Sequence, residues 1–352
     1  MTVYIINVFS IFIWQFILKL SNIKNSNLYL TIIMTIQLFI LSAFRHYTVG
    51  YDTVNYVNRY SIIANTPFNN LPNISGRLDF EMGYIYVNKF LSYINSDYRF
   101  LLIVTSLFIL ISFGIFIYTN SKITWLSYFV FITLGYWGSS LNVLRQFISI
   151  SILLLGIRFV QKSQLGRFIF TVLVASTIHT SALFFVVIYP LSKLNLNRYF
   201  YIIYSLSLAL LFRFAQPVTL WLMYNFGYSD LSNRLDSGSG FGMLILLVII
   251  LIGSLLFKRQ TEVYIENFDL YIKILLVGIL LNVLALNFAM IGRAMLYFTI
   301  INIVLIPNLI SAMQNTNNRI IVTSAIVISF LWFYYFVLMP TDAGGIVPYI
   351  FA

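Results

Sequence analysis

Apolar runs of about 20 residues alternate with short polar segments along nearly the whole chain. A helix of that length spans the ~30 Å hydrocarbon core of a bilayer, so each run predicts one crossing. The first run lacks a basic start and a cleavage site before Lys19, and we expect it to stay as a helix. The pattern predicts an all-α polytopic membrane protein, one integral membrane domain over 1–352. About ten transmembrane helices are expected near 3–20, 28–44, 99–118, 123–138, 142–160, 199–216, 241–257, 269–289, 294–312 and 319–339.

One further apolar run, 165–190, carries polar side chains at its centre. Ser176 to Ser181 surround His179, and the run ends at Pro190. If this segment enters and returns on one side, twelve basic residues collect on that side, as the positive-inside tendency of cytoplasmic loops requires. A straight crossing fits that tendency less well, so we predict a broken or re-entrant segment at 165–190. The twelve are Lys19, Lys24, Lys122, Arg158, Lys162, Arg167, Lys193, Arg198, Lys258, Arg259, Lys273 and Arg319.

The opposite, extracytoplasmic side receives two long loops, 45–98 and 217–240, in which we expect amphipathic helices. Seven of the eight Lys lie on the cytoplasmic side, whereas eight of the 13 Arg lie outside or at outer span ends. Arg binds phosphate or carboxylate through two parallel hydrogen bonds, which Lys cannot form. The outer face is therefore predicted to hold an anion. These arginines are Arg45, Arg59, Arg77, Arg99, Arg145, Arg213, Arg234 and Arg293.

Composition narrows the function further. The 352 residues are 60% hydrophobic and only 9% charged, against about 25% charged in soluble proteins, which excludes a soluble domain. The absence of Cys excludes disulfides and thiolate nucleophiles, and two His with scattered acids argue against a protein-bound metal or other cofactor. The net charge of +11 is dispersed over span ends, so we expect anionic lipid or a phosphate-bearing substrate and no nucleic acid.

Two acids of the first outer loop are candidate bases. Asp52 shares a helical face with Asn55 and Arg59, so this segment is predicted to be a surface helix. Asp52 either serves the site or caps that helix. Glu81 opens an amphipathic stretch over 80–94 and either accepts the proton of a sugar hydroxyl or is a solvated carboxylate.

Arg145 lies three residues inside a predicted span, where a guanidinium is costly unless it is paired. It either binds a ligand anion, with Gln146 as a neutral donor beside it, or snorkels or forms a structural ion pair with Asp52 or Glu81. His179 is either a packed polar group or a proton relay and hydrogen-bond donor to a diphosphate.

Two positions near the C-terminus complete the candidates. Arg293 and Tyr297 project from one helical face four residues apart and together could hold a charged head group and a sugar. Tyr349 follows Pro348 outside the last span, where it either contacts substrate or is an aromatic interface anchor.

In the order of these motifs the sequence resembles the EpsG family of polytopic membrane proteins, which belong with the Wzy-type polysaccharide polymerases. The resemblance implies a GT-C-like glycosyltransferase that joins repeat units carried on undecaprenyl diphosphate at the outer face of a bacterial plasma (inner) membrane, in exopolysaccharide, O-antigen or capsule synthesis. The implied partners are lipid-linked donor and acceptor, membrane lipids, a chain-length regulator and a flippase. The matching pieces are Arg45 with Gly50, Asp52, Thr53 and Tyr56; Glu81 with Gly83 and Tyr84; Leu144, Arg145 and Gln146; His179 with Ser181 and Ala182; Arg293 with Tyr297; and Pro348 with Tyr349.

Such a reaction asks the protein to neutralise charge on the leaving diphosphate and to orient an acceptor hydroxyl, which arginines and a base can do without metal. Our hypothesis places Arg145, Arg293 and Arg45 around the diphosphate. Asp52 or Glu81 is the acceptor-positioning base with His179 nearby. Gln146, Tyr297 and Tyr349 complete the substrate-binding set, and Tyr56 and Tyr84 stack on sugar rings.

Two other functions would use similar residues. A flippase or transporter of the same lipid-linked oligosaccharide also needs outer arginines, although such carriers often show internal repeats and none is visible. A membrane O-acyltransferase of surface glycans would use His179 as its base. A purely structural scaffold gives no reason for Arg145 or for the one-sided excess of Arg.

Overall fold

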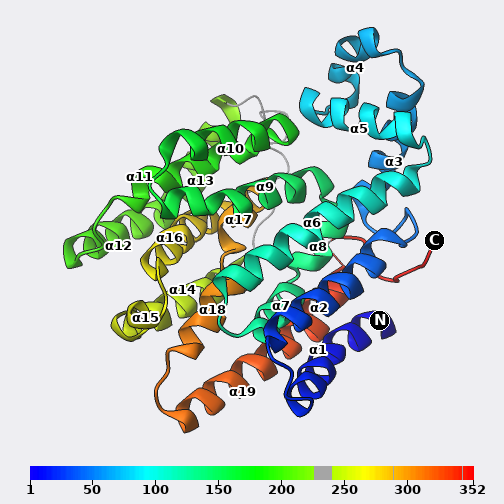
Figure 1. Cartoon of the computed structure of the whole chain (residues 1–352). Coiled ribbons are helices and arrows are strands. Elements are labelled where there is room, and N and C mark those ends of the chain that lie inside the picture. Colours follow the sequence, from blue (N-terminus) through cyan, green and yellow to red (C-terminus); the bar gives the residue numbers. More distant parts are fainter. Residues whose placement is uncertain (226–239, 288, 343) are drawn as a thin grey trace.

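The computed structural model describes residues 1–225, 240–287, 289–342 and 344–352, and all regular elements in these ranges are helical (Figure 1). The one β-bridge found there, between Arg45 and Phe351, is isolated. The all-α prediction is confirmed. The helices are α1 (Thr2–Leu20), α2 (Ser26–Ala43), α3 (Tyr51–Asn65), η1 (Phe68–Asn70), α4 (Leu71–Leu78), α5 (Met82–Ile94), α6 (Tyr98–Asn120), α7 (Thr124–Thr133), α8 (Tyr136–Asn142), α9 (Leu144–Gln161), α10 (Leu165–Ile178), η2 (Thr180–Val187), α11 (Ile188–Ser192), α12 (Arg198–Arg213), α13 (Ala215–Asn225), α14 (Phe241–Leu256), α15 (Lys258–Tyr264), α16 (Phe268–Ala285), α17 (Ala289–Thr299), α18 (Asn302–Ser311), α19 (Thr316–Trp332), η4 (Phe333–Leu338) and α20 (Met339–Thr341).

The number of spans is close to the predicted ten. Within the described ranges, seven stretches are long and apolar enough to cross a membrane: α1, α2, α6, α9, α16, Ile291–Ser311 and Thr316–Thr341. Two bent pairs, Arg198–Arg213 with Ala215–Trp221 (77°) and Phe241–Leu256 with Lys258–Tyr264 (74°), raise the number to nine. The remaining predicted span, 123–138, is divided between α7 and α8 at Gly135, whose φ of 78° favours glycine. The chain is therefore a multi-pass membrane protein.

The spans form an inner and an outer layer. The window over α16 is 72% buried and the one over Ile291–Ser311 is 78% buried, whereas Thr316–Thr341 is only 11% buried. Apolar side chains such as Ile328 and Phe336 of that last stretch point outward. A surface this apolar needs a lipid environment.

Hydrogen bonds between span ends define one end of the bundle, which we call the basic face. Asn308 Nδ2 donates to the carbonyl of Asn120 (2.7 Å), and the Tyr271 hydroxyl donates to Asn120 Oδ1 (2.9 Å). Lys273 Nζ donates to the carbonyl of Ser192 (3.0 Å). The ends of α6, α11 and α18 and the start of α16 therefore lie together.

The segment 165–190 is a re-entrant hairpin, as predicted. α10 ascends from the basic face, the chain turns at His179, and η2 with α11 returns. The Tyr189 hydroxyl donates to the carbonyl of Ser163 (3.0 Å), and Lys193 Nζ donates to Ser163 Oγ (2.5 Å), so both ends of the hairpin lie at the same face. The 14 residues of α10 rise about 21 Å, less than the ~30 Å of a hydrocarbon core.

At the other end of the bundle, which we call the site face, α3, α4 and α5 form a cap beyond α6 (Figure 1). The C-terminal segment runs beside α3 and is held by backbone bonds from Gly50 N to the carbonyl of Gly345 (2.8 Å) and from Tyr51 N to that of Gly344 (3.0 Å). α3 and α5 are the helices predicted for the first outer loop. Of the second, 217–240, the part after Asn225 up to residue 239 lies outside the described residues.

Candidate functional site

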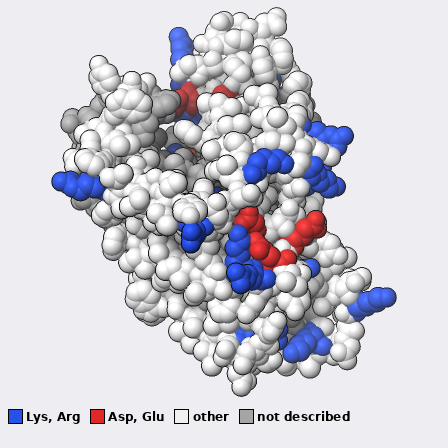
Figure 2. Space-filling model, turned by 90° about the vertical axis from the view of Figure 1, so that its left-hand side faces the viewer, with Lys and Arg blue, Asp and Glu red and all other residues white. Residues whose placement is uncertain are grey.

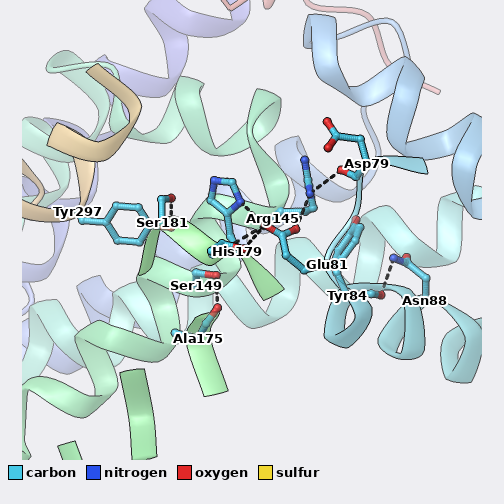
Figure 3. Close-up of polar contacts among 11 residues, drawn as sticks. Asp79, Glu81, Tyr84, Asn88, Arg145, Ser149, Ala175, His179, Ser181 and Tyr297 are labelled. Carbon is cyan, nitrogen blue, oxygen red and sulfur yellow. Dashed lines mark hydrogen bonds and ion pairs between the residues drawn. The ribbon is translucent and has the colours of Figure 1, made fainter. Parts of the chain in front are cut away.

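Glu81 is the centre of a group of charged and polar side chains at the site face. It is the N-cap of α5, and its carboxylate accepts hydrogen bonds from two other segments. Arg145 Nη1 lies 2.5 Å from Oε2, His179 Nδ1 lies 3.0 Å from Oε1, and the backbone N of Thr180 lies 2.9 Å from Oε1. Figure 3 shows Arg145 and His179 converging on Glu81. We call Glu81, Arg145, His179 and Thr180 the Glu81 cluster.

Arg145 is held on three sides. It is the second residue of α9, two residues nearer the helix start than the sequence predicted, because the chain breaks at Val143. Its Nη1 also donates to the carbonyl of Asp79 (3.0 Å), and its guanidinium lies 4.4 Å from the centroid of the Phe80 ring. Its Nε is buried and meets no acceptor among the described residues. Of the alternatives for Arg145, the structure contains the ion pair with Glu81. Part of the guanidinium remains available to a ligand.

His179 occupies the tip of the re-entrant hairpin. Its backbone is extended (φ −152°), which ends α10 and turns the imidazole toward α5. A proton on Nδ1 is donated to the Glu81 carboxylate, which leaves Nε2 as the acceptor nitrogen of a neutral ring. Nε2 has no hydrogen-bond partner within the described part of the chain, and the side chain is 23% exposed. The geometry suits a proton acceptor oriented by a carboxylate.

The cluster sets the charge of Glu81. Burial raises the pKa of this carboxyl, but the hydrogen bond from His179, the positive charge of Arg145 and the backbone N–H of Thr180 together outweigh it and lower the pKa from 4.5 to about 2. Glu81 is therefore ionised at neutral pH. So acidic a group is a weak proton acceptor, and its carboxylate suits orientation of His179 better than abstraction of a proton.

A second ion pair joins α3 to α17. Arg293 Nη2 lies 3.3 Å from Asp52 Oδ2, and the Arg293 side chain is 51% exposed. Gln146 Nε2 donates to the backbone carbonyl of Arg293, so the residue next to Arg145 fixes this helix. The N-cap of α3 is Gly50, not Asp52 as the capping alternative supposed. Asp52 instead occupies the first turn, where its side chain is free for Arg293.

Tyr297 lies between these groups and the hairpin. Its hydroxyl is 3.2 Å from Ser181 Oγ, and the ring is 2% exposed (Figure 3). The predicted pair of Arg293 and Tyr297 therefore does not act as one surface: Arg293 faces solvent and Asp52, whereas Tyr297 packs inward.

The tyrosines predicted to stack on sugars are packed in the interior. The ring of Tyr56 stacks on Phe80 at 5.7 Å, and Tyr84 meets Phe80 edge-on at 5.1 Å. Tyr56 is 6% exposed and Tyr84 is fully buried, so neither offers an open ring face. Their place is to support Phe80, on which Arg145 and Arg59 both lie, the latter at 4.6 Å.

Arg45 and Tyr349 lie apart from the site and bind backbone. Arg45 is fully buried, and its guanidinium donates to the carbonyls of Leu141 (3.0 Å), Val49 (3.4 Å) and Ser42. The Tyr349 hydroxyl donates to the carbonyl of Leu41. Each of the three guanidinium nitrogens of Arg45 donates to a backbone carbonyl, so the structure does not place Arg45 at a diphosphate, and Tyr349 anchors the C-terminal segment.

Two residues of the site were missed from sequence, and a third, Gly83, was matched to the family pattern without a structural role. Phe80 could not be singled out among 33 Phe, because its role is to pack against the guanidinium of Arg145, a contact that the sequence does not show. Thr180 supplies a backbone N–H, which no side-chain pattern reveals. Gly83 is required by a close approach: a Cβ there would lie 2.5 Å from the carbonyl oxygen of Thr177, so glycine lets α5 reach the hairpin tip.

The site offers cations and hydrogen-bond donors to an anion. In the described ranges, no three His, Asp or Glu side chains are grouped as a metal would require. In Figure 2 the surface is hollowed near the top of the view, and acidic and basic atoms are visible at the edge of the hollow. Two guanidiniums, an imidazole and their carboxylate partners can bind a phosphorylated ligand and move one proton.

These features define a multi-pass helical membrane protein with a charged site under a cap of surface helices. The chain belongs to the EpsG family, whose family model matches residues 27–351. Membership assigns it a polysaccharide-polymerase type of role, of the glycosyltransferase-like class. Neither the curated proteins nor the solved structures contain a significant match, so the GT-C-like architecture stays a prediction.

Proposed function

We propose that the protein joins oligosaccharide repeat units carried on undecaprenyl diphosphate into a polysaccharide, at the extracytoplasmic face of a bacterial plasma membrane. One observation supports this most: Glu81 brings an imidazole, that of His179, and a guanidinium, that of Arg145, together from separate segments. Family membership supplies the class of product.

In the proposed reaction, a hydroxyl oxygen of the acceptor sugar attacks C1 of the donor sugar. The bond from C1 to the diphosphate oxygen breaks, and its electron pair leaves with undecaprenyl diphosphate. The hydroxyl proton passes to Nε2 of His179. Glu81 accepts the Nδ1 proton in a hydrogen bond, which fixes the tautomer and stabilises the imidazolium that forms. General-base catalysis of this kind contributes about 10²–10⁴-fold.

Arg145 and Arg293 bind the diphosphate in this proposal. Planar guanidiniums match phosphate oxygens bidentately and stabilise the charge that grows on the leaving group. The carboxylates of Glu81 and Asp52 hold both side chains in place before the donor arrives. Because arginines can neutralise the leaving group, the proposed chemistry requires no metal. Arg45 is not part of this set.

The distribution of lysines bears on the side of the membrane at which the site lies. The basic face carries Lys193 and Lys273 and, by the course of the spans, most of the other lysines, as cytoplasmic surfaces do. The Glu81 cluster lies at the opposite end of the hairpin. This supports an extracytoplasmic site, where lipid-linked repeat units would be joined.

The proposal is tested by elongation in vitro. Purified protein is given a defined undecaprenyl-diphosphate oligosaccharide in detergent, with and without EDTA, and chain length is read on a gel or by mass spectrometry. We expect longer lipid-linked products under both conditions. A flippase cannot lengthen its cargo, so no product from a folded protein would reject the polymerase, and loss with EDTA that Mg²⁺ restores would reject metal independence.

A further inference from the structure

An apolar cavity opens on the basic face, between the returning leg of the hairpin and two spans. It has a volume of about 290 Å³ and is lined by α11, α12 and α16, with Leu191, Phe200, Tyr204 and Leu276 among its walls. Ile203 also lines it and is 65% exposed, so the cavity meets the lipid-facing surface of α12. A cavity with such walls takes an acyl chain better than a polar solute.

Two cations stand in sequence beside the lining residues. Lys193 follows Leu191 by two residues, and Arg198 precedes Phe200 by two. Lys193 Nζ contacts Ser163 Oγ (2.5 Å), and Arg198 stacks on Tyr199 at 4.7 Å. Within the described residues neither lies within 4.0 Å of a carboxylate.

The third cation at the cavity is already neutralised. Lys273 lines the wall, is 5% exposed and pairs with Asp269 at 2.6 Å. Asp269 also pairs with Lys258 (2.6 Å), which in turn pairs with Glu262 (3.5 Å), so two carboxylates balance two ammonium groups. Figure 2 views this side of the molecule and shows Lys and Arg side chains around a compact acidic group near the centre of the view, with further acidic atoms near the top. Lys193 and Arg198, which flank the lining residues in sequence, therefore keep their positive charge at this end of the molecule.

We propose that this cavity binds one anionic phospholipid from the leaflet at the basic face. An acyl chain fills the space between α11, α12 and α16, and the phosphate lies at Lys193 and Arg198. Basic pockets between transmembrane helices select anionic headgroups in this way. The site is distinct from the Glu81 cluster, because α10, whose 14 residues rise about 21 Å, separates the base of the hairpin from His179.

A lipid bound in this cavity would support the returning leg of the hairpin. α11 is the last part of the returning leg, and its end is held by the bond from Lys273 Nζ to the carbonyl of Ser192. An acyl chain packed against Leu191 adds apolar contact to that support. Anionic lipid is therefore expected to raise the thermal stability of the protein.

The test measures lipid binding to the full purified chain in a neutral detergent, by native mass spectrometry and by thermal unfolding. Phosphatidylglycerol is compared with phosphatidylcholine of the same acyl chains. A cation near a membrane surface contributes about fivefold in affinity, so Lys193→Gln with Arg198→Gln should weaken phosphatidylglycerol binding about thirtyfold. Ser207→Trp, which fills the cavity from α12, should abolish the bound lipid.

Arg319→Gln is the matched control, because it removes a cation from α19 away from this cavity. Each variant must unfold at the wild-type temperature without lipid, and agreement between the charge and filling variants guards against a folding defect in either one. Equal binding of both phospholipids, or phosphatidylglycerol binding unchanged in the double variant, would overturn the proposal. So would displacement of phosphatidylglycerol by an equal amount of undecaprenyl phosphate, which would assign the cavity to the substrate's own lipid.

Discussion

Replacing Glu81 with Gln tests the site most directly. The substitution keeps the size of the side chain and removes its charge. A neutral amide has one oxygen, so it cannot accept from Arg145, His179 and the Thr180 N–H as the carboxylate does. His179 then loses the partner that fixes its tautomer, and Arg145 loses its ion pair at 2.5 Å.

The expected loss of activity follows from the role of Glu81, and the expected loss of stability follows from its pKa. Loss of an oriented base should lower kcat of elongation by about 10²–10⁴-fold. KM for the lipid-linked donor should change little, because Arg145 keeps its contacts with the Asp79 carbonyl and the Phe80 ring. The lowered pKa of Glu81, about 2 against 4.5, corresponds to about 3 kcal/mol of stabilisation at most, reduced by solvent screening at a side chain that is 19% exposed.

The stability effect has a defined pH window. A pKa lower in the folded state than in the unfolded state stabilises the fold fully above the unfolded pKa. The part of the difference in unfolding free energy between wild type and Glu81→Gln that comes from ionisation of Glu81 should therefore be fully present above about pH 5. It should shrink as the pH falls from 4.5 toward 2.

The assay is the in vitro elongation reaction, with kcat and KM measured separately and thermal unfolding measured in the same detergent. Asp97→Asn is the matched control: Asp97 caps α6 by accepting from Arg99 N at 2.9 Å, and Asn caps as well. Wild-type kcat in a folded Glu81→Gln protein would refute the orienting role. A rise in KM with kcat unchanged would make Glu81 a binding residue instead.

Substitutions at three other residues separate the remaining parts of the site. Arg145→Lys should fold but give shorter polymer on a gel, because an ammonium cannot contact Glu81, Asp79 and Phe80 together; wild-type lengths from a normally expressed Arg145→Ala protein would remove this residue from the mechanism. Gly83→Val should lower the unfolding free energy by about 1–3 kcal/mol and reduce elongation, since its Cβ would press on the hairpin tip; unchanged melting would contradict that contact. Asp52→Asn should raise KM for the donor modestly with kcat nearly unchanged, and a loss of kcat matching that of Glu81→Gln would make Asp52 the base.

The two ion pairs hold the arginines of the site to different degrees. Both arginines proposed for the diphosphate are held by carboxylates, at 2.5 Å for Arg145 and 3.3 Å for Arg293. The first pair is largely shielded and also stacked on Phe80, whereas Arg293 is half exposed. Arg293 is therefore the easier of the two for an incoming phosphate to engage, and Arg145 is the more rigidly placed.

Much of the fold was predictable from the sequence. Runs of about 20 apolar residues have only one low-energy backbone in lipid, because unpaired backbone groups are too costly there. The re-entrant segment was predictable as well, since His179 with its polar neighbours interrupts an apolar run and the count of basic residues decides on which side the chain returns. The break at Gly135 was not, because the run 123–138 is apolar on both sides of the glycine.

The site was predictable in its members more than in its arrangement. The sequence alone determined that Arg145 needed a partner and that His179 interrupts an apolar run, because charge and polarity in apolar surroundings carry a cost visible at each position. Glu81 was one of two candidate bases in an outer loop. The sequence did not determine that Glu81 serves both Arg145 and His179, that Arg45 binds only backbone, or that Tyr56 and Tyr84 pack beneath Phe80. These assignments depend on which segments meet at the hairpin tip, and only the packing of α3, α5, α9 and α10 decides that, since contacts between distant segments leave no local pattern in the chain.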